Sequence, residues 1–248
     1  LARTAKHYGL KAELEAVDFS SVAKHLSETI STIGVHDSPQ RFRSLGIDVF
    51  FGAPRFVDNK TIIVESTEGT KTLKAKKFVI STGSRAAIPP IPGLDKTPYI
   101  TNREIFNLAN LPKKLYIIGA GPIGIEMAQS FARLGSKVTV VNTGPRILIR
   151  EDADVTALIE AQLEMEGVVL LHNSKIISVA PQKITLDING TQSTHTFDEL
   201  LVATGRTPNV EQLDLEKAGV QFTPKGIIVN TKLQTTQNNI YAVGDVAG

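Results

Sequence analysis

The chain has 248 residues, with 27 lysines and arginines against 25 aspartates and glutamates, so its formal charge is +2. Apolar residues make up 42% and charged residues 21%, a composition typical of globular chains rather than disordered or fibrous ones. This charge does not favour nucleic acid as a partner, no apolar run is long enough for a membrane span, and the absence of cysteine excludes disulfides and thiolate chemistry within these residues.

The first hundred residues predict two helices followed by short strands. Apolar residues at helical spacing predict a helix over 19–34, and Ser38-Pro39 begins a second helix that runs to Leu45. Strands separated by turns are expected at residues 47–51, 56–57, 61–65, 71–74 and 78–82. The prolines in residues 88–93 exclude helix and inner strand, so we expect a surface linker there.

From residue 115 the pattern changes to alternating strands and helices. We expect strands at 115–118, 137–141 and 168–171, with helices at 122–134 and 155–166 between them. This order predicts a parallel sheet with right-handed crossovers. Further strands are expected at 176–179, 183–188 and 194–197 as an antiparallel excursion, and then at 200–203 and from residue 240.

A glycine-rich turn lies between the first of these strands and its helix. Gly119 permits the tight turn, Gly121 lets the backbone approach a pyrophosphate, and Gly124 allows close packing of helix on strand. Pro122 and Ile123 open the helix, whose free N–H groups and dipole favour a phosphate. The motif in this context predicts a dinucleotide site, the plain alternative being a turn without a ligand.

The second strand of this unit ends in a residue that bears on the choice of nucleotide. An acid at this place binds the ribose 2′-hydroxyl of NAD, but the chain has Asn142 there. Asn142 can bond a hydroxyl without repelling a 2′-phosphate, and Arg146 is available to pair with such a phosphate or is simply an exposed loop residue. The choice between NAD and NADP therefore stays open, with a slight lean to NADP.

Glu126 is the candidate catalytic residue. We place it in the first turn of the helix, where a carboxylate either favours the helix dipole or lies close to a nicotinamide ring. The five histidines show no metal-ligand spacing, so no metal site is predicted.

Five motifs follow one another in the order found in one known family. They lie at residues 78–83, 88–94, 119–126, 201–209 and 241–245, and together they cover nearly the whole chain. With them the chain resembles an internal piece of a flavin-dependent pyridine nucleotide–disulfide oxidoreductase. The stretch Arg150-Glu-Asp152 and the residues around 204–209 most resemble the mercuric reductase-like branch, with dihydrolipoamide dehydrogenase and glutathione reductase as nearby branches.

The resemblance implies an α/β fold in which a Rossmann-like NAD(P)-binding domain is inserted in a partial FAD-binding domain. The expected boundaries are 1–110 for the partial FAD-binding domain, 111–203 for the NAD(P)-binding domain and 204–248 for the return segment of the FAD-binding domain. The implied cofactors are FAD and NAD(P)H. The intact protein is expected to be a cytoplasmic homodimer that acts on a small-molecule or disulfide substrate, without nucleic acid.

The resemblance also assigns roles to single residues. Glu126 matches a glutamate that pairs with a lysine beside the flavin, Gly205 matches a glycine beside the nicotinamide half of the nucleotide, and the Ile176 backbone matches one that meets the adenine. Asp245 matches the aspartate that bonds the ribityl chain of FAD. The other residues implied to lie near FAD are Gly52, Ala53, Thr82, Gly83 and Gly244.

The departures from the family pattern limit what this chain does by itself. The first glycine fingerprint of the FAD site, the redox-active cysteine pair and the dimerisation domain have no counterpart in these residues. We therefore expect an internal fragment, and assign to its parent the transfer of hydride from NAD(P)H to flavin and on to a disulfide or thiol-bound metal. The alternatives are a non-catalytic NAD(P)-binding module and a cysteine-free NAD(P)H:quinone or flavin reductase.

Overall fold

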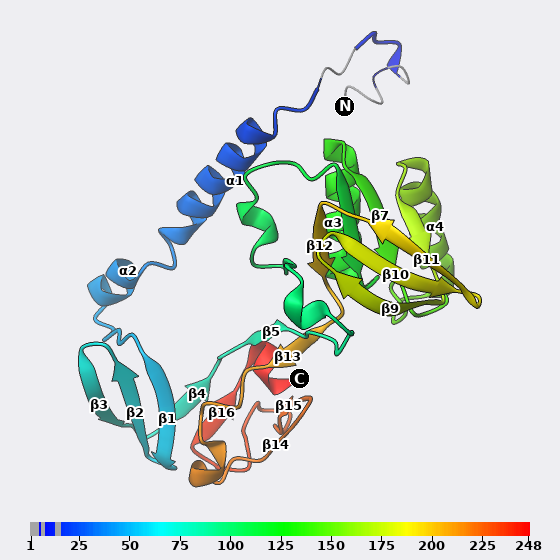
Figure 1. Cartoon of the computed structure of the whole chain (residues 1–248). Coiled ribbons are helices and arrows are strands. Elements are labelled where there is room, and N and C mark those ends of the chain that lie inside the picture. Colours follow the sequence, from blue (N-terminus) through cyan, green and yellow to red (C-terminus); the bar gives the residue numbers. More distant parts are fainter. Residues whose placement is uncertain (1–4, 6–7, 13–15) are drawn as a thin grey trace. The chain divides into compact units, whose positions relative to one another are not determined.

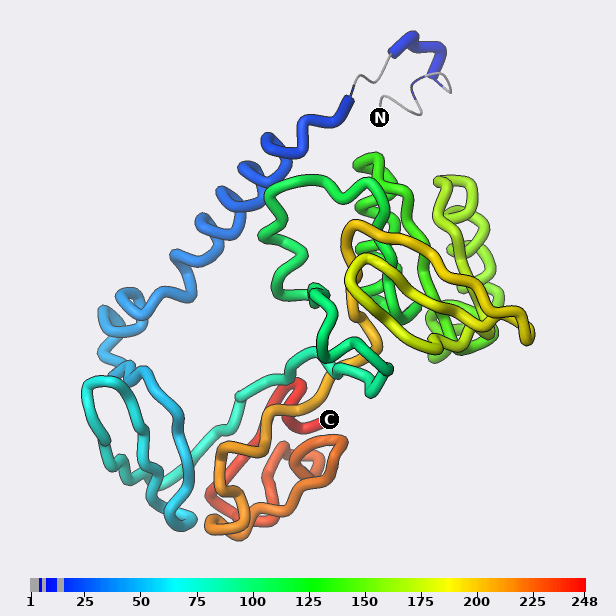
Figure 2. The backbone as a smooth tube through the Cα atoms, viewed as in Figure 1, coloured from blue at the N-terminus to red at the C-terminus, as the bar shows by residue number. Residues whose placement is uncertain are grey.

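A computed structural model describes residues 5, 8–12 and 16–248. The described residues fall into two compact units: the first comprises those up to Thr32 together with Ile88–Gly205, and the second comprises Ile33–Ala87 together with Arg206–Gly248. Figure 2 follows the chain from one unit into the other. The divisions lie at 32/33, 87/88 and 205/206, whereas the sequence predicts boundaries at 110/111 and 203/204. The cofactor assigned to each part stays a prediction.

The first unit is built on a parallel sheet of four strands in the order β12-β6-β7-β8 (Figure 1). Its strands are β6 (Lys114–Ile118), β7 (Lys137–Val141), β8 (Val169–Leu171) and β12 (Glu199–Val202), and its crossover helices are α3 (Pro122–Leu134) and α4 (Ala153–Met165). All three strand pairs are parallel. The predicted strand–helix alternation and parallel sheet are confirmed.

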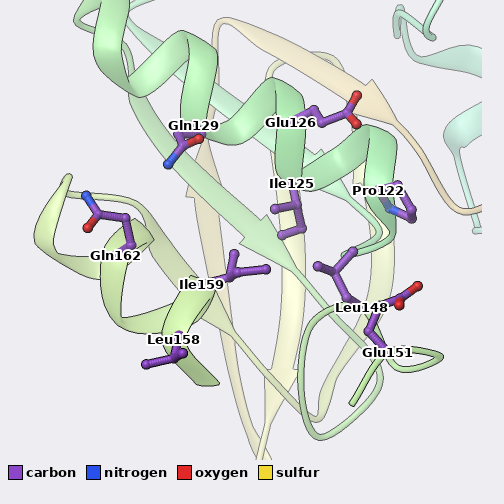
Figure 3. A pocket seen from close by; sticks show the side chains of 9 residues that line it. All are labelled: Pro122, Ile125, Glu126, Gln129, Leu148, Glu151, Leu158, Ile159 and Gln162. Atoms are coloured by element: carbon purple, nitrogen blue, oxygen red, sulfur yellow. The ribbon is translucent and has the colours of Figure 1, made fainter. Parts of the chain in front are cut away.

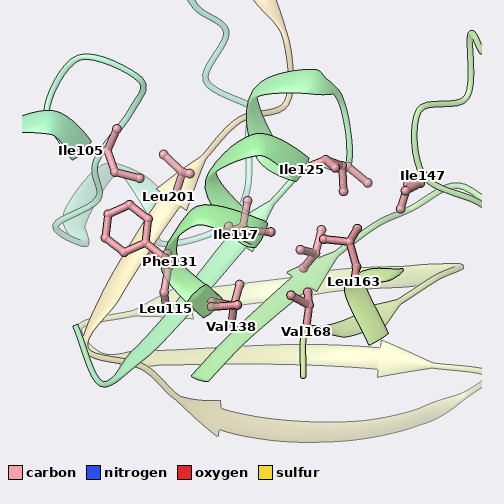
Figure 4. Packing of buried hydrophobic residues seen from close by; sticks show 14 residues of the cluster. Ile105, Leu115, Ile117, Ile125, Phe131, Val138, Ile147, Leu163, Val168 and Leu201 are labelled. Carbon is pink, nitrogen blue, oxygen red and sulfur yellow. The ribbon is translucent and has the colours of Figure 1, made fainter. Parts of the chain in front are cut away.

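The two faces of this sheet bury alternate residues, because successive side chains of a strand point to opposite sides. Leu115 and Ile117 of β6 pack with α3 and α4 (Figure 4). Tyr116 and Ile118 face the antiparallel sheet of three strands. That sheet consists of β9 (Ser174–Ala180), β10 (Lys183–Ile188) and β11 (Thr191–Thr196), as the sequence predicts.

The proline-rich stretch before the first unit's sheet is irregular, as predicted, but it is not a free surface linker. The Val179 amide donates to the Pro92 carbonyl oxygen at 2.9 Å, and Leu94 is fully buried. Two short 3₁₀ helices follow, η2 (Leu94–Lys96) and η3 (Ile105–Asn107). These contacts explain why the longer segment of the first unit begins at residue 88.

The long N-terminal helix α1 (Phe19–Gly34) has its predicted bounds. The ring of Phe19 lies 6.4 Å from that of Phe131 between centroids. Further along, Ile30 and Ile33 are more than half exposed. None of the helices in the described part of the chain has both the length and the apolar character needed to cross a membrane.

The second unit opens with α2 (Pro39–Ser44), capped by the Ser38 hydroxyl, and then consists of short strands. Strands β1 (Ala53–Asp58), β2 (Thr61–Ser66) and β3 (Gly69–Lys74) form an antiparallel sheet, while three further pairs join distant or neighbouring segments. Those pairs are β4 (Phe78–Ile80) with β16 (Ile240–Ala242), β5 (Ser84–Ala86) with β13 (Arg206–Pro208), and β14 (Phe222–Thr223) with β15 (Gly226–Ile227). Two 3₁₀ helices, η4 (Leu215–Ala218) and η5 (Gly244–Ala247), complete the unit and contribute buried residues to its core.

One predicted strand of this unit is wrong, and the strands of the β5–β13 and β14–β15 pairs were not predicted. Residues 47–51 form no strand. Strand β1 begins at Ala53, which pairs with Glu65. Because β2 ends one residue later, at Ser66, it offers residues 47–51 no partner strand. Phe51 is 66% exposed. The three-residue strands β5 and β13 are too short to show a period of two.

Candidate functional site

The glycine turn between β6 and α3 is shaped by two close backbone approaches. Gly119 has a φ of +109°, and a Cβ there would overlap the carbonyl oxygen of Ala203. A Cβ on Gly124 would overlap the carbonyl oxygen of Gly119 itself. Glycine is therefore required at both positions for packing alone.

Gly121 differs from its two neighbours, since packing does not require glycine there. Its φ of −78° suits any residue, and a Cβ at this position would have no heavy atom within 4 Å. It is the N-cap of α3 and supplies no side-chain cap, and Pro122 follows at the first helical position. The N–H groups of Ile123 and Gly124 lie in the first turn, where helix geometry gives them no partner. The space beside Gly121 is thus open, lined by donors and suited to an anion.

Asn142 follows β7 and organises the loop after it. Its Nδ2 donates to the Arg146 carbonyl oxygen at 2.8 Å, and its Oδ1 accepts from the Gly144 amide at 3.1 Å. Nδ2 also lies 3.3 Å from Nδ1 of His172, which follows β8. The amide is half-buried and holds a tight turn over 142–146.

Arg146 also acts within this loop. Its guanidinium donates to the carbonyl oxygens of Glu151 at 2.8 Å and Ile149 at 3.0 Å, and to Thr156 Oγ1 at 3.1 Å. The Leu148 amide in turn donates to Ala120 in the glycine turn at 2.9 Å. Arg146 therefore joins the loop to the start of α4, and its pairing with a 2′-phosphate stays a prediction.

Glu126 lies in the second turn of α3, not the first, because the helix begins at Pro122. It is one of the residues around a groove of about 500 Å³ between α3 and α4. Ile125, Leu148 and Ile159 point toward one another in this groove, and the Glu126 carboxylate points away from them (Figure 3). The groove is also lined by Pro122, Gln129, Glu151, Leu158 and Gln162.

The other two residues assigned to the nucleotide lie elsewhere in the first unit. Ile176 stands on β9 opposite Leu186, half-buried in the core beneath the antiparallel sheet. Gly205 has a φ of +142°, and a Cβ there would have no heavy atom within 4 Å. No group of three metal-binding side chains occurs among the described residues.

In the second unit, the Thr82–Gly83 turn is tied to Asn209. Thr82 Oγ1 donates to the Asn209 carbonyl oxygen at 2.8 Å, and Asn209 Nδ2 donates back to the Thr82 carbonyl oxygen at 2.9 Å. Gly83 has a φ of +66°. Gly52, with a φ of +150°, passes so close to Glu65 that a Cβ would overlap its carbonyl oxygen, and Ala53 begins β1 directly after it.

Asp245 is the second residue of η5, directly after Gly244, and contacts two residues of the β5–β13 pair. Its Oδ2 accepts from Ser84 Oγ at 2.6 Å and from Arg206 Nε at 3.1 Å. The Ser84 hydroxyl and then the Arg206 guanidinium hold the pKa of Asp245 below its ordinary value. Both contacts end on Oδ2, so Oδ1 is not engaged by either residue. Sequence reasoning did not identify Ser84 or Arg206, since neither short strand is visible in the pattern.

Ser84→Ala is expected to raise the pKa of Asp245 toward its ordinary value. A carboxyl group whose pKa is lowered by folding stabilises the fold at pH values above its ordinary pKa. That contribution is lost as the pH falls through the lowered pKa. With the pKa of Asp245 closer to its ordinary value, the stability of Ser84→Ala should therefore depend less on pH in the acid range. A carbon-detected NMR titration gives the pKa of the Asp245 carboxyl group in the unmodified chain and in Ser84→Ala. Ser44→Ala, on the exposed end of α2, is the control, and an unchanged Asp245 pKa in Ser84→Ala would contradict the assignment.

Comparison with known proteins places these features in context. A family model for pyridine nucleotide-disulphide oxidoreductases matches residues 9–248. The chain is 32% identical to a mercuric reductase of Staphylococcus aureus over 251 residues, covering 99% of this chain and 45% of that protein. It is 33% identical to a dihydrolipoyl dehydrogenase of Bacillus subtilis over 241 residues, covering 96% of this chain and 52% of that protein.

The solved structures point the same way. The HOCl-induced flavoprotein disulfide reductase RclA from Escherichia coli matches with a TM-score of 0.82 and 30% identity, covering 100% of this chain and 55% of that one. The chain spans about half the length of the curated relatives it matches.

Proposed function

The chain belongs to the pyridine nucleotide-disulphide oxidoreductase family, and on that basis we propose that it supplies the nicotinamide-nucleotide site and part of the flavin site of an FAD-dependent NAD(P)H oxidoreductase. Members of the family use FAD and NAD(P)H. The bound cofactors would supply the redox chemistry, a hydride passing from NAD(P)H to the flavin and its electrons on to a disulfide or thiol-bound metal.

The observation that carries the proposal is the contrast among the three glycines of the β6–α3 turn. Two of them are required by packing, whereas Gly121 opens onto free space next to unpaired helix N–H groups. A turn that serves only packing does not need glycine at that place. Ile123 and Gly124 would hold a pyrophosphate there, and Pro122, which lacks an N–H, fixes the first turn of the helix.

Part of a flavin site fits the second unit in the same way. Gly83 and Gly244 both have positive φ, and a Cβ on either would have no heavy atom within 4 Å. Asp245 lies directly after Gly244, and Oδ1 is the oxygen that would accept a ribityl hydroxyl. Thr82, Gly52 and Ala53 would complete the contacts of this chain with FAD. In the first unit Glu126 would be the catalytic residue, and Gly205 and Ile176 would contact the nucleotide.

Titration of the full chain with NADH and NADPH tests the nucleotide site. Gly121→Val should weaken binding at least about tenfold, since its side chain fills the space beside the helix N-terminus. Its loss of stability should stay within about 1 kcal/mol, because valine is a poorer helix N-cap than glycine but its Cβ meets no neighbouring atom. Isothermal calorimetry gives the dissociation constants, with Gly34→Ala as the control because a Cβ there meets nothing. Absence of binding by the unmodified chain, or equal affinity in Gly121→Val, would overturn the proposal.

A second candidate is a non-catalytic NAD(P)-binding module. It is supported by the fact that the whole glycine turn, its sheet and its helices lie within one compact unit. A flavin that stays with the purified chain would favour the oxidoreductase, and activity toward a quinone without added thiol would favour a quinone reductase. For the intact protein we also propose a cytoplasmic homodimer acting on a small-molecule or disulfide substrate, on the strength of the family membership.

A further inference from the structure

The residue after β7 is Asn142 rather than an acid, but the carboxylate of Glu160 is connected to it through His172. Glu160, on α4, has its Oε1 3.4 Å from Nε2 of His172, and both side chains are 24% exposed. The other ring nitrogen of His172 lies 3.3 Å from Nδ2 of Asn142. Asn142 after β7, His172 after β8 and Glu160 on α4 thus form a continuous series. It begins at the position where an acid is expected in an NAD site.

The hydrogen bonds around Asn142 fix the direction of this series. Its Oδ1 accepts from the Gly144 amide and its Nδ2 donates to the Arg146 carbonyl oxygen, which settles the orientation of the side-chain amide. Nδ2 can therefore only donate to Nδ1 of His172. A neutral His172 then carries its proton on Nε2, facing the Glu160 carboxylate.

Glu160 is held in this position by the backbone. Its Oε1 also accepts from the Ile147 amide at 2.9 Å, within the same loop that Arg146 fastens to α4. The negative charge is therefore placed at the strand ends by two contacts rather than left free on the surface of the helix.

Acidic residues outnumber basic ones in the part of the chain around Glu160. Over residues 142–175, all of which the structure describes, the sequence has three lysines and arginines against six aspartates and glutamates. Arg146 donates to the carbonyl oxygens of Glu151 and Ile149 and to Thr156 Oγ1, so these guanidinium donors are already engaged within the loop. Arg150 is exposed and is followed directly by Glu151 and Asp152.

We propose that this site selects NADH over NADPH, with Glu160 as the specificity-determining residue acting through His172 and Asn142. The inference rests on the proposed nucleotide site and favours the other nucleotide than the slight lean to NADP drawn from the sequence. A 2′-phosphate adds a charge of about −1.5 to −2 at neutral pH, which the Glu160 carboxylate repels. The ribose hydroxyl of NADH meets no such repulsion, and Asn142 Oδ1 has a second lone pair to accept it.

Dissociation constants of the full chain for NADH and NADPH at low ionic strength test this proposal. NADH is expected to bind at least about tenfold more tightly. Glu160→Gln keeps an oxygen for the Ile147 amide but removes the charge, so it should reduce the preference about threefold to tenfold, mainly by strengthening NADPH binding. Glu164→Gln, at an exposed position of the same helix, makes the same charge change and should leave the preference unaltered.

Each outcome has a separate meaning. Binding of neither nucleotide overturns the proposed site itself. If the unmodified chain binds NADPH as tightly as NADH, or more tightly, the proposed nucleotide site is supported but the proposed selectivity is overturned. This outcome does not depend on whether the variants fold. NADH preference with Glu160→Gln indistinguishable from Glu164→Gln overturns the role of Glu160.

Discussion

Gly124→Ala is expected to lower the free energy of unfolding of the first unit by about 1–3 kcal/mol, because the added methyl group overlaps the carbonyl oxygen of Gly119 and must push α3 away from β6. Guanidinium denaturation followed by circular dichroism measures the change. The same shift displaces the first turn of α3, so nucleotide affinity should fall together with stability.

Gly121→Ala is the matched control for this prediction. It makes the same chemical change three residues earlier, at a φ of −78° and in open space. Alanine is a poorer helix N-cap than glycine, so Gly121→Ala should lower the free energy of unfolding by up to about 1 kcal/mol. This is less than the loss expected for Gly124→Ala, because the new methyl group at position 121 meets no neighbouring atom. Equal stability of Gly124→Ala and the unmodified chain would show that the close approach of helix to strand is not a constraint in solution.

Ile117→Ala and Ile240→Ala are expected to destabilise different units by about 2–5 kcal/mol each, since both side chains are fully buried. Ile117 lies beneath α3 in the first unit, and Ile240 lies in the core of the second. Ile117→Ala should also weaken NADH binding, because β6 leads directly into the glycine turn. Ile240→Ala should leave that affinity unchanged.

Hydrogen exchange assigns each loss of stability to its unit, and calorimetry gives the NADH affinity of both variants. If Ile240→Ala weakened NADH binding as strongly as Ile117→Ala, the nucleotide site would not belong to the first unit alone. If each variant lost protection evenly across both units, the units would unfold as one.

The sequence predicted the first unit in detail because its elements are long and strongly periodic. Helix α3 begins and ends at the predicted residues, between a proline at its first position and Gly135, which has a φ of +115°. Strand β7 has its predicted bounds as well. Local signals of this kind depend on neighbouring residues, which a sequence displays directly.

The contacts of single side chains were not predictable in the same way. The sequence did not decide whether Arg146 binds a phosphate or is an exposed loop residue. In the structure it donates to backbone oxygens, whose positions depend on the path of the loop. Glu160 carried no signal, since its relation to His172 arises from the packing of α4 beside β8. Arg206 and Ser84 are adjacent only because the chain returns after more than a hundred residues.

The pairing of β4 with β16 has a consequence for synthesis of the chain. β4 is made about 160 residues before the strand it pairs with, and the first unit's main segment lies between them. At ribosomal rates this interval amounts to roughly 8–30 s, during which the first unit can fold while the edge of β4 stays unpaired. Chaperones that bind nascent strands therefore have a defined window in which to protect residues 78–80.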